Sequence, residues 1–151
     1  MKKFILTLTF LFTLATINAM TISEFVSKYD KDKDKDVEVV HLNKLALAEM
    51  SLSNKSLRNI DDIKVLNITN LSEDKKNDIK NNIVILKSQK DYDLNVKDDG
   101  SYVFLKMKDD KITEILVINF EEDSDECHIV TVKGDLKLDD ANNINGFSDR
   151  K

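Results

Sequence analysis

The sequence predicts an α+β fold, mainly an antiparallel sheet with helices packed on one face. Three observations support this prediction. Strand-forming runs separated by polar turns fill residues 92–133, helical patterns gather before them, and the segment Ile112–Phe120 is apolar at both odd and even positions. A segment that is apolar on both sides is expected to be a strand buried on both faces, and therefore the central strand of the sheet. Strands in one block and helices in another are typical of α+β domains.

Helical patterns precede this block at three places. A capping-box spacing over residues 21–24 begins a short amphipathic helix that ends near Asp30. Asn43 is a candidate cap for a second helix that runs through Met50. The longest helix is expected over residues 72–89, with carboxylates in its first turn and lysines at its end.

The strands are expected to form a C-terminal four-stranded meander plus one earlier strand. The earlier strand is the apolar run Ile63–Thr69. The meander is expected over residues 92–96, 102–107, 112–120 and 128–133. Its first turn contains Asp99-Gly100, a strong hairpin signal. Residues 37–40 are a further β-prone run, and Asp139 is a candidate cap for a final short helix.

The N-terminal residues 1–19 differ from the rest of the chain. Two lysines precede an apolar stretch over residues 4–15, and Ile17-Asn18-Ala19 provides a small-residue exit. This is the layout of a secretory signal peptide, and the apolar stretch is shorter than the roughly 20 residues that span a bilayer. We therefore expect residues 1–19 to be a signal peptide. The alternative is an N-terminal helix or strand of the fold.

The mature chain, residues 20–151, is expected to be a single domain with a frayed tail from about residue 146. Signal cleavage would leave 21 basic against 28 acidic residues, for a net charge of −7. Because these charges are interspersed and mostly negative, we exclude nucleic-acid binding. No cysteine stands at the cleavage site to accept a lipid, and no later segment is apolar for long enough to cross a membrane.

Cys127 is the only cysteine, so the chain forms no intramolecular disulfide. Its neighbour His128 suggests a catalytic pair, but adjacent residues of a strand point to opposite faces and cannot form a dyad. His41 is the second histidine, and nothing in the sequence places it near Cys127. No spacing typical of a transition-metal site is present, and we expect no cofactor.

Residues 30–36 alternate aspartate and lysine. The candidate calcium ligands are Asp30, Asp32 and Asp34, which match the first three ligand positions of an EF-hand loop. The match then fails, because Lys35 occupies the position of the turn glycine and His41 that of the bidentate glutamate. We interpret the stretch as a solvated loop and keep a calcium-dependent module as an alternative.

Glu114 is the only charged residue inside the most apolar strand. Burial would raise the pKa of such a carboxyl and suit it to general acid or base work. No second carboxylate or nucleophile has a spacing that completes a site. We expect Glu114 to lie toward an edge of one face and to pair with a lysine such as Lys106 or Lys111.

The order of several segments resembles a known family. These segments are Val37-Glu38-Val39-Val40-His41-Leu42-Asn43-Lys44, Ile63-Lys64-Val65-Leu66, Tyr92-Asp93-Leu94, Ile112-Thr113-Glu114-Ile115-Leu116-Val117 and Ile129-Val130-Thr131-Val132-Lys133-Gly134. Together they resemble DUF4252, a family of secreted or lipid-anchored envelope proteins of Bacteroidetes-type bacteria with no assigned activity. The resemblance implies a periplasmic or secreted location and gives no catalytic residue.

These observations favour an exported, non-enzymatic module that binds an envelope protein or a small ligand. The alternatives are a hydrolase with an unfamiliar site that uses Glu114, His41 or His128, and the calcium-dependent module described above. A polar-lined pocket on the sheet would favour an enzyme or a ligand binder, whereas a flat apolar patch would favour a protein partner.

Overall fold

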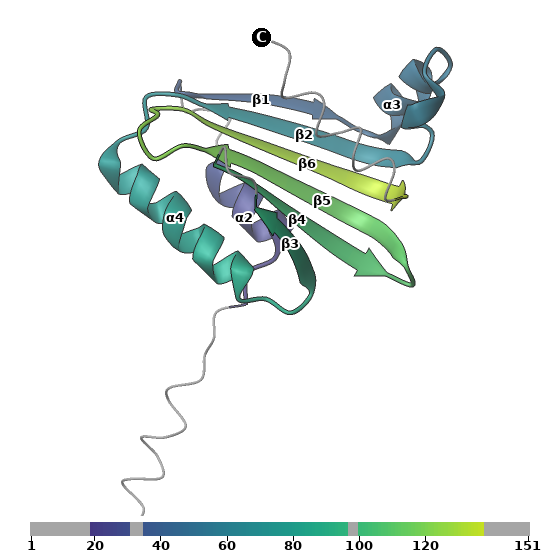
Figure 1. Ribbon diagram of the computed structural model, residues 1–151. Coiled ribbons are helices and arrows are strands. Elements are labelled where there is room, and N and C mark those ends of the chain that lie inside the picture. The colour runs from purple at the N-terminus through teal and green to yellow at the C-terminus, as the bar shows by residue number, and fades with distance from the viewer. Residues whose placement is uncertain (1–18, 31–34, 97–99, 138–151) are drawn as a thin grey trace, which may run out of the picture.

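The computed structural model describes residues 19–30, 35–96 and 100–137, and within them the chain forms one six-stranded antiparallel sheet and three α-helices (Figure 1). The helices are α2 (Ile22–Tyr29), α3 (Lys44–Ser51) and α4 (Glu73–Lys87), with a 3-10 turn η1 (Lys55–Leu57). The strands are β1 (Val37–Leu42), β2 (Ile60–Ile68), β3 (Tyr92–Val96), β4 (Ser101–Lys108), β5 (Lys111–Phe120) and β6 (Cys127–Leu136). The predicted α+β class is confirmed.

The strand order is β1-β2-β6-β5-β4-β3, so β5 lies between β4 and β6 as the sequence predicts. The predicted meander is the β3–β6 part of this sheet. One strand more than expected is present at the other edge. The run 37–40 extends to Leu42 and pairs with β2, with Val37 opposite Ile68 and Leu42 opposite Ile63. A short edge strand is stable only when it pairs with a neighbouring strand, and residues 37–40 alone do not show which strand that is.

The helices begin at the predicted caps. The Thr21 side chain accepts from the Glu24 N–H and the Glu24 carboxylate accepts from the Thr21 N–H, which completes the capping box of α2. Asn43 caps α3 and Ser72 caps α4 through the same kind of side-chain acceptor. Residues 1–18 of the signal segment, the helix expected after Asp139 and the tail lie outside the described residues.

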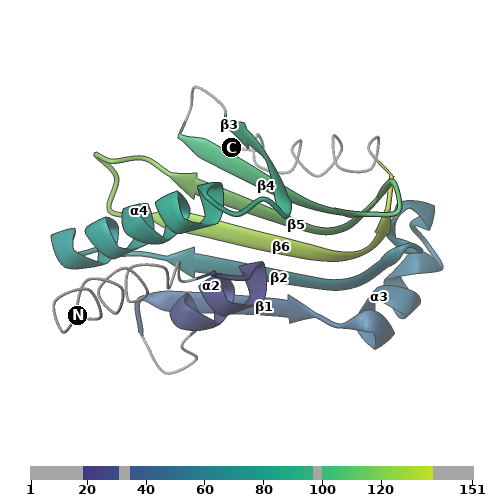
Figure 2. The same cartoon turned by 90° about the horizontal axis from the view of Figure 1, so that it is seen from below.

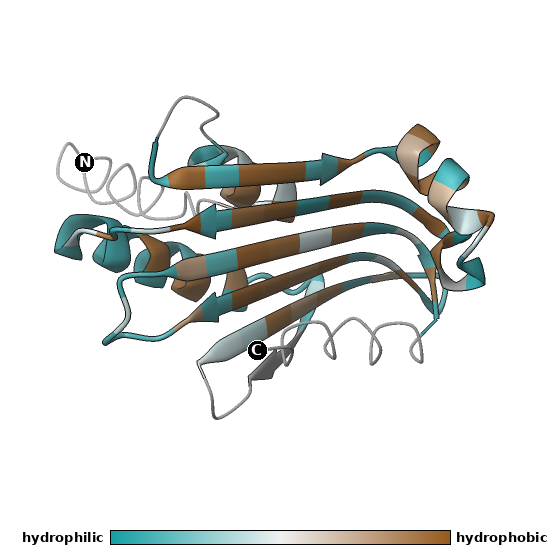
Figure 3. Ribbon diagram, turned by 90° about the horizontal axis from the view of Figure 1, so that it is seen from above, coloured by the Kyte–Doolittle hydropathy of each residue, from teal (hydrophilic) through white to brown (hydrophobic). Residues whose placement is uncertain are grey.

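The sheet separates two apolar clusters. The face that packs against α2 and α4, here called the helix face, carries Leu66, Phe104, Leu116, Ile118 and Ile129, all fully buried. The opposite face carries Ile60, Val103, Ile112, Ile115, Val117, Val132 and Leu136, with Leu47 of α3 packed among them. In Figures 1 and 2, α2 and α4 lie on one side of the sheet and α3 lies at its end. Figure 3 shows that apolar residues occur in every one of the long strands.

Three bulges interrupt the sheet near one end. The register shifts between Ile60 and Asp62 in β2, between Lys106 and Met107 in β4, and between Ile112 and Glu114 in β5. A bulge changes which side chains face which side of a sheet. The β2 bulge lies against Gly134 of β6, where an added Cβ would meet the backbone oxygen of Asn59 at 2.1 Å.

We predict that Gly134→Ala destabilises the protein by about 1–3 kcal/mol, the usual cost of overpacking, because the obstructing atom belongs to the backbone and cannot rotate away. Urea unfolding followed by circular dichroism measures this change. Val40→Ala, at a side chain that is 44% exposed, is the control and should cost less than about 1 kcal/mol. Equal effects of the two substitutions would contradict the close approach at Gly134.

Candidate ligand-binding groove

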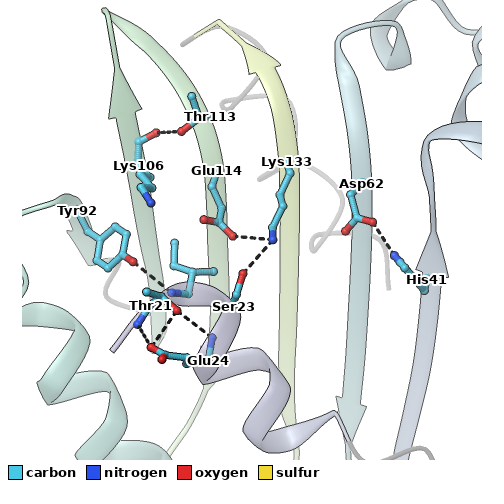
Figure 4. A network of polar contacts seen from close by, with 11 residues as sticks. Thr21, Ser23, Glu24, His41, Asp62, Tyr92, Lys106, Thr113, Glu114 and Lys133 are labelled. Atoms are coloured by element: carbon cyan, nitrogen blue, oxygen red, sulfur yellow. Dashed lines mark hydrogen bonds and ion pairs between the residues drawn. The ribbon is translucent and has the colours of Figure 1, made fainter. Parts of the chain in front are cut away.

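A row of alternating charges crosses the helix face beside the three bulges. Asp62 of β2 lies opposite Lys133 of β6, Lys133 lies opposite Glu114 of β5, and Glu114 lies opposite Lys106 of β4. Tyr92 of β3 follows Lys106 at the end of this row. We call these five residues the charge row; Figure 4 shows them side by side across the strands, with the start of α2 next to Tyr92, Glu114 and Lys133. The row places five ionisable side chains from five strands on one surface.

A solvent-connected groove of about 330 Å³ lies between α2 and this part of the sheet. Eight of its nine lining residues have a polar side chain, and they come from α2 and from strands β1, β2, β5 and β6. The lining residues are Ser23, Val26, Ser27, His41, Asp62, Lys64, Glu114, Thr131 and Lys133. The size lies at the lower end of the range for small-molecule sites, about 300–1,000 Å³. Two of the sequence candidates, Glu114 and His41, therefore reach the same groove.

Glu114 is the most enclosed charge of the groove, with only 12% of its side chain exposed. Its Oε1 atom is buried and has no hydrogen-bond donor within the structure. The Lys133 ammonium lies 3.4 Å away, close enough for an ion pair. The expected lysine partner is therefore present, but it is Lys133 rather than Lys106 or Lys111. Lys111 instead pairs with Asp135 at 2.7 Å.

Lys133 connects the sheet to α2. Its Nζ donates to the Ser23 hydroxyl at 2.9 Å while it faces Glu114. A serine beside a lysine can act as a nucleophile only when the lysine is neutral and removes the hydroxyl proton. Here Lys133 Nζ is the donor to the Ser23 hydroxyl and also pairs with the Glu114 carboxylate. The contact therefore holds the helix and does not activate Ser23.

The other ionisable side chains of the groove are also paired. His41 Nε2 lies 2.6 Å from Asp62 Oδ1. Lys64 forms an ion pair with Asp30, the residue that ends α2. Each of these pairs therefore links a strand to its neighbour or to α2, and every ionisable side chain in the lining has a partner.

The first turn of α2 forms one wall of the groove and is firmly attached. Ile22 and Phe25 are fully buried, and the Ile22 N–H donates to the Tyr92 hydroxyl at 3.2 Å. Burial raises the pKa of Tyr92, and the charge of Glu114 acts in the same direction. The hydrogen bonds from the backbone and hydroxyl of Thr21 lower the pKa of Glu24. These contacts fix the wall against which a ligand would bind.

Cys127 and His128 point to opposite faces, as the sequence predicts. Cys127 is fully buried in the helix-face cluster, and burial raises the pKa of its thiol to about 12. His41 is in register with Lys64, which pairs with Thr131, four residues or about 13 Å along β6 from Cys127. The thiol is therefore a packing group and has no histidine partner.

His128 belongs to a second polar row, on the opposite face of the sheet. Its Nδ1 lies 3.0 Å from Asn67 Oδ1, and Asn67 Nδ2 donates to Glu38 Oε2 at 3.4 Å. On the other side of His128 in the register is Asn119, which accepts from the Ser101 hydroxyl at 2.8 Å. His128 thus lies away from the groove, and the sheet separates it from Glu114 and His41.

The candidate calcium ligands are only partly described. Asp30 is bound to Lys64 and ends α2, while Asp32 and Asp34 lie outside the described residues. Within residues 19–30, 35–96 and 100–137, no group of three or more histidine, cysteine or carboxylate side chains is arranged to hold a metal ion.

The sequence alone did not identify the other groove residues. Asp62, Lys64 and Lys133 each follow or interrupt an apolar strand, as Glu114 does. These charged residues in or beside apolar strands were the feature of the sequence that could have indicated the groove, since charged residues near the same end of neighbouring strands meet on one face. The bulges and the register, which bring them together, were not visible in the chain.

No protein-family model, curated protein or solved structure matches the chain. In the part of the chain that the structure describes, no helix has the length and apolar character needed to cross a membrane.

We predict that the two partners of the Lys133–Glu114 pair respond unequally to neutralisation. Lys133→Met leaves an enclosed carboxylate without its counter-ion and should cost about 2–3 kcal/mol, whereas Glu114→Gln leaves a half-exposed ammonium in water and should cost less than about 1 kcal/mol. Chemical denaturation of both variants at neutral pH measures the difference. Lys111→Met, which removes an exposed ion pair, is the control and should change stability by less than about 1 kcal/mol. A larger loss for Glu114→Gln than for Lys133→Met would contradict the burial of Glu114.

Proposed function

We propose that the protein is an exported, non-enzymatic binding module whose binding site for a small polar ligand is the groove beneath α2. The single observation that supports this most is Glu114 Oε1, a buried acceptor without a hydrogen-bond donor on a side chain that lines a solvent-connected groove. Most buried polar atoms in folded proteins have a partner, and a bound ligand is one explanation of an exception.

The lining favours a ligand over a protein partner. The groove is concave and presents several polar side chains that converge on one place, whereas protein-docking surfaces have an apolar centre. Catalysis has weaker support, because the groove contains no activated nucleophile. Ser23 accepts from a charged lysine, and Cys127 is buried elsewhere.

A hydrolase is the second candidate, on one observation. The 2.6 Å contact between His41 and Asp62 is the orienting half of a base–carboxylate pair, and His41 lines the groove. No hydroxyl or thiol contacts His41 in the part of the chain that the structure describes. The nucleophile would have to be a water molecule that His41 activates.

Backbone NMR of the isotope-labelled mature chain tests the binding proposal. Titration with a library of small polar metabolites should shift the amide signals of Ser23, Thr131 and Lys133, which line the groove, and leave the signal of His128 on the opposite face unchanged. The same spectra report hydrolysis, because a turned-over compound gives new ligand signals with time. Binding without turnover supports the module, turnover that His41→Ala abolishes supports the hydrolase, and no shift with any compound contradicts both.

Export is proposed from the layout of residues 1–19, and with it a periplasmic or secreted location. The resemblance to DUF4252 agrees with that location and stays a prediction. N-terminal sequencing of the protein recovered outside the cytoplasm of an expressing bacterium should begin at Met20, within one or two residues. Recovery in the cytoplasm with Met1 intact would contradict export. An Ala19→Arg variant, which blocks the predicted cleavage, should retain the segment.

A further inference from the structure

We propose that the ligand of the groove is a neutral polyhydroxyl compound of the monosaccharide class, bound by hydroxyl groups between Glu114 and Lys133. This inference rests on the proposed function and specifies the chemistry of the same site.

The groove contains polar atoms whose hydrogen-bonding capacity is not fully used by the protein. Glu114 Oε1 is an acceptor that no protein group satisfies. Lys133 Nζ, 3.4 Å away, has three protons, of which one is donated to Ser23 and one can face Glu114. An acceptor and a spare donor therefore lie side by side. A hydroxyl group both donates and accepts, so one hydroxyl or two neighbouring ones satisfy both atoms.

The pairing of the ionisable side chains disfavours an ionic ligand. Lys64 is paired with Asp30, His41 with Asp62, and Lys133 with Glu114. A ligand ammonium at Glu114 would meet Lys133, and Lys106 stands on the other side of Glu114 in the register. A ligand carboxylate at Lys133 would meet Glu114 and Asp62, which flank that lysine in the same row. A neutral ligand avoids both repulsions.

The rest of the lining contains several hydroxyl groups. They belong to Ser23, Ser27 and Thr131, which lie around the charge row. Their side chains can exchange hydrogen bonds with a polyol in either direction. The volume of about 330 Å³ suits a single sugar ring rather than an oligosaccharide. No phenylalanine, tyrosine or tryptophan side chain is in this lining, so binding lacks the stacking on such rings that strengthens many sugar sites, and we expect a dissociation constant of about 0.1–10 mM.

Titration of the mature chain with defined probes, read by NMR shifts of the groove amides, tests the inference. The neutral probes are D-glucose, D-mannose, N-acetyl-D-glucosamine and myo-inositol; the charged probes are glycine, L-lysine, glucosamine and succinate. At least one neutral probe should bind, and at least tenfold more tightly than any charged probe. N-acetyl-D-glucosamine and glucosamine form a related pair in which an acetyl group removes the charge of one nitrogen.

Variants of the groove residues then identify which side chains contact the ligand. Glu114→Gln should weaken binding of the neutral probe about tenfold, because a charge-assisted hydrogen bond becomes a neutral one. Ser23→Ala, at an exposed helix position, should weaken it several-fold and guards against a folding defect at Glu114. Glu126→Gln, the same chemical change on an exposed loop residue beside His128, is the matched control and should leave binding unchanged.

Each other outcome is informative. Tighter binding of a charged probe in the groove overturns the neutral class and leaves the proposed function standing. Binding of no compound overturns both. Binding of a sugar with equal affinity to the chain and to its Glu114→Gln variant overturns the assignment of the contact to Glu114.

Discussion

The burial of β5 on both faces is the constraint on which the rest of the structure depends. Leu116 and Ile118 lie in the cluster under α2 and α4, while Ile115 and Val117 lie in the cluster of the opposite face. Truncation of one such side chain typically costs about 2–5 kcal/mol, and a slip of one residue would exchange the two sets between the faces and disrupt the packing of both clusters. The register of β5 against β4 and β6 is therefore strongly specified. That register determines which way Glu114 points.

The bulge in β5 turns one charged side chain of this buried strand toward the candidate groove. Strict alternation would place Ile112 and Glu114 on the same face, two residues apart. The shift between them instead leaves Ile112 in the opposite-face cluster and turns Glu114 toward the groove beneath α2. The sequence was sufficient to predict the two-sided strand, the meander and the helix caps, because each depends on local pattern. It could not predict the groove, which depends on bulges and on pairing between β1, β2 and β6 that only the folded chain reveals.

The groove also explains why a charged residue stands in the most apolar strand. A leucine at position 114 would pack under α2 without the cost of an enclosed carboxylate, so stability alone does not account for Glu114. Departures from the apolar pattern that reduce stability are expected at functional sites. Lys133, Ser23 and the capping box then act together, because they hold the first turn of α2 above the carboxylate without occupying its buried oxygen.

A high-resolution crystal structure of the mature chain, soaked with the tightest-binding sugar, tests this account most directly. The account predicts a ligand hydroxyl oxygen about 2.5–3.0 Å from Glu114 Oε1, with Lys133 Nζ still bound to Ser23. A groove closed by Lys106 or Lys133, with either ammonium moved to about 2.8 Å from Oε1 and no room for a ligand, would contradict it.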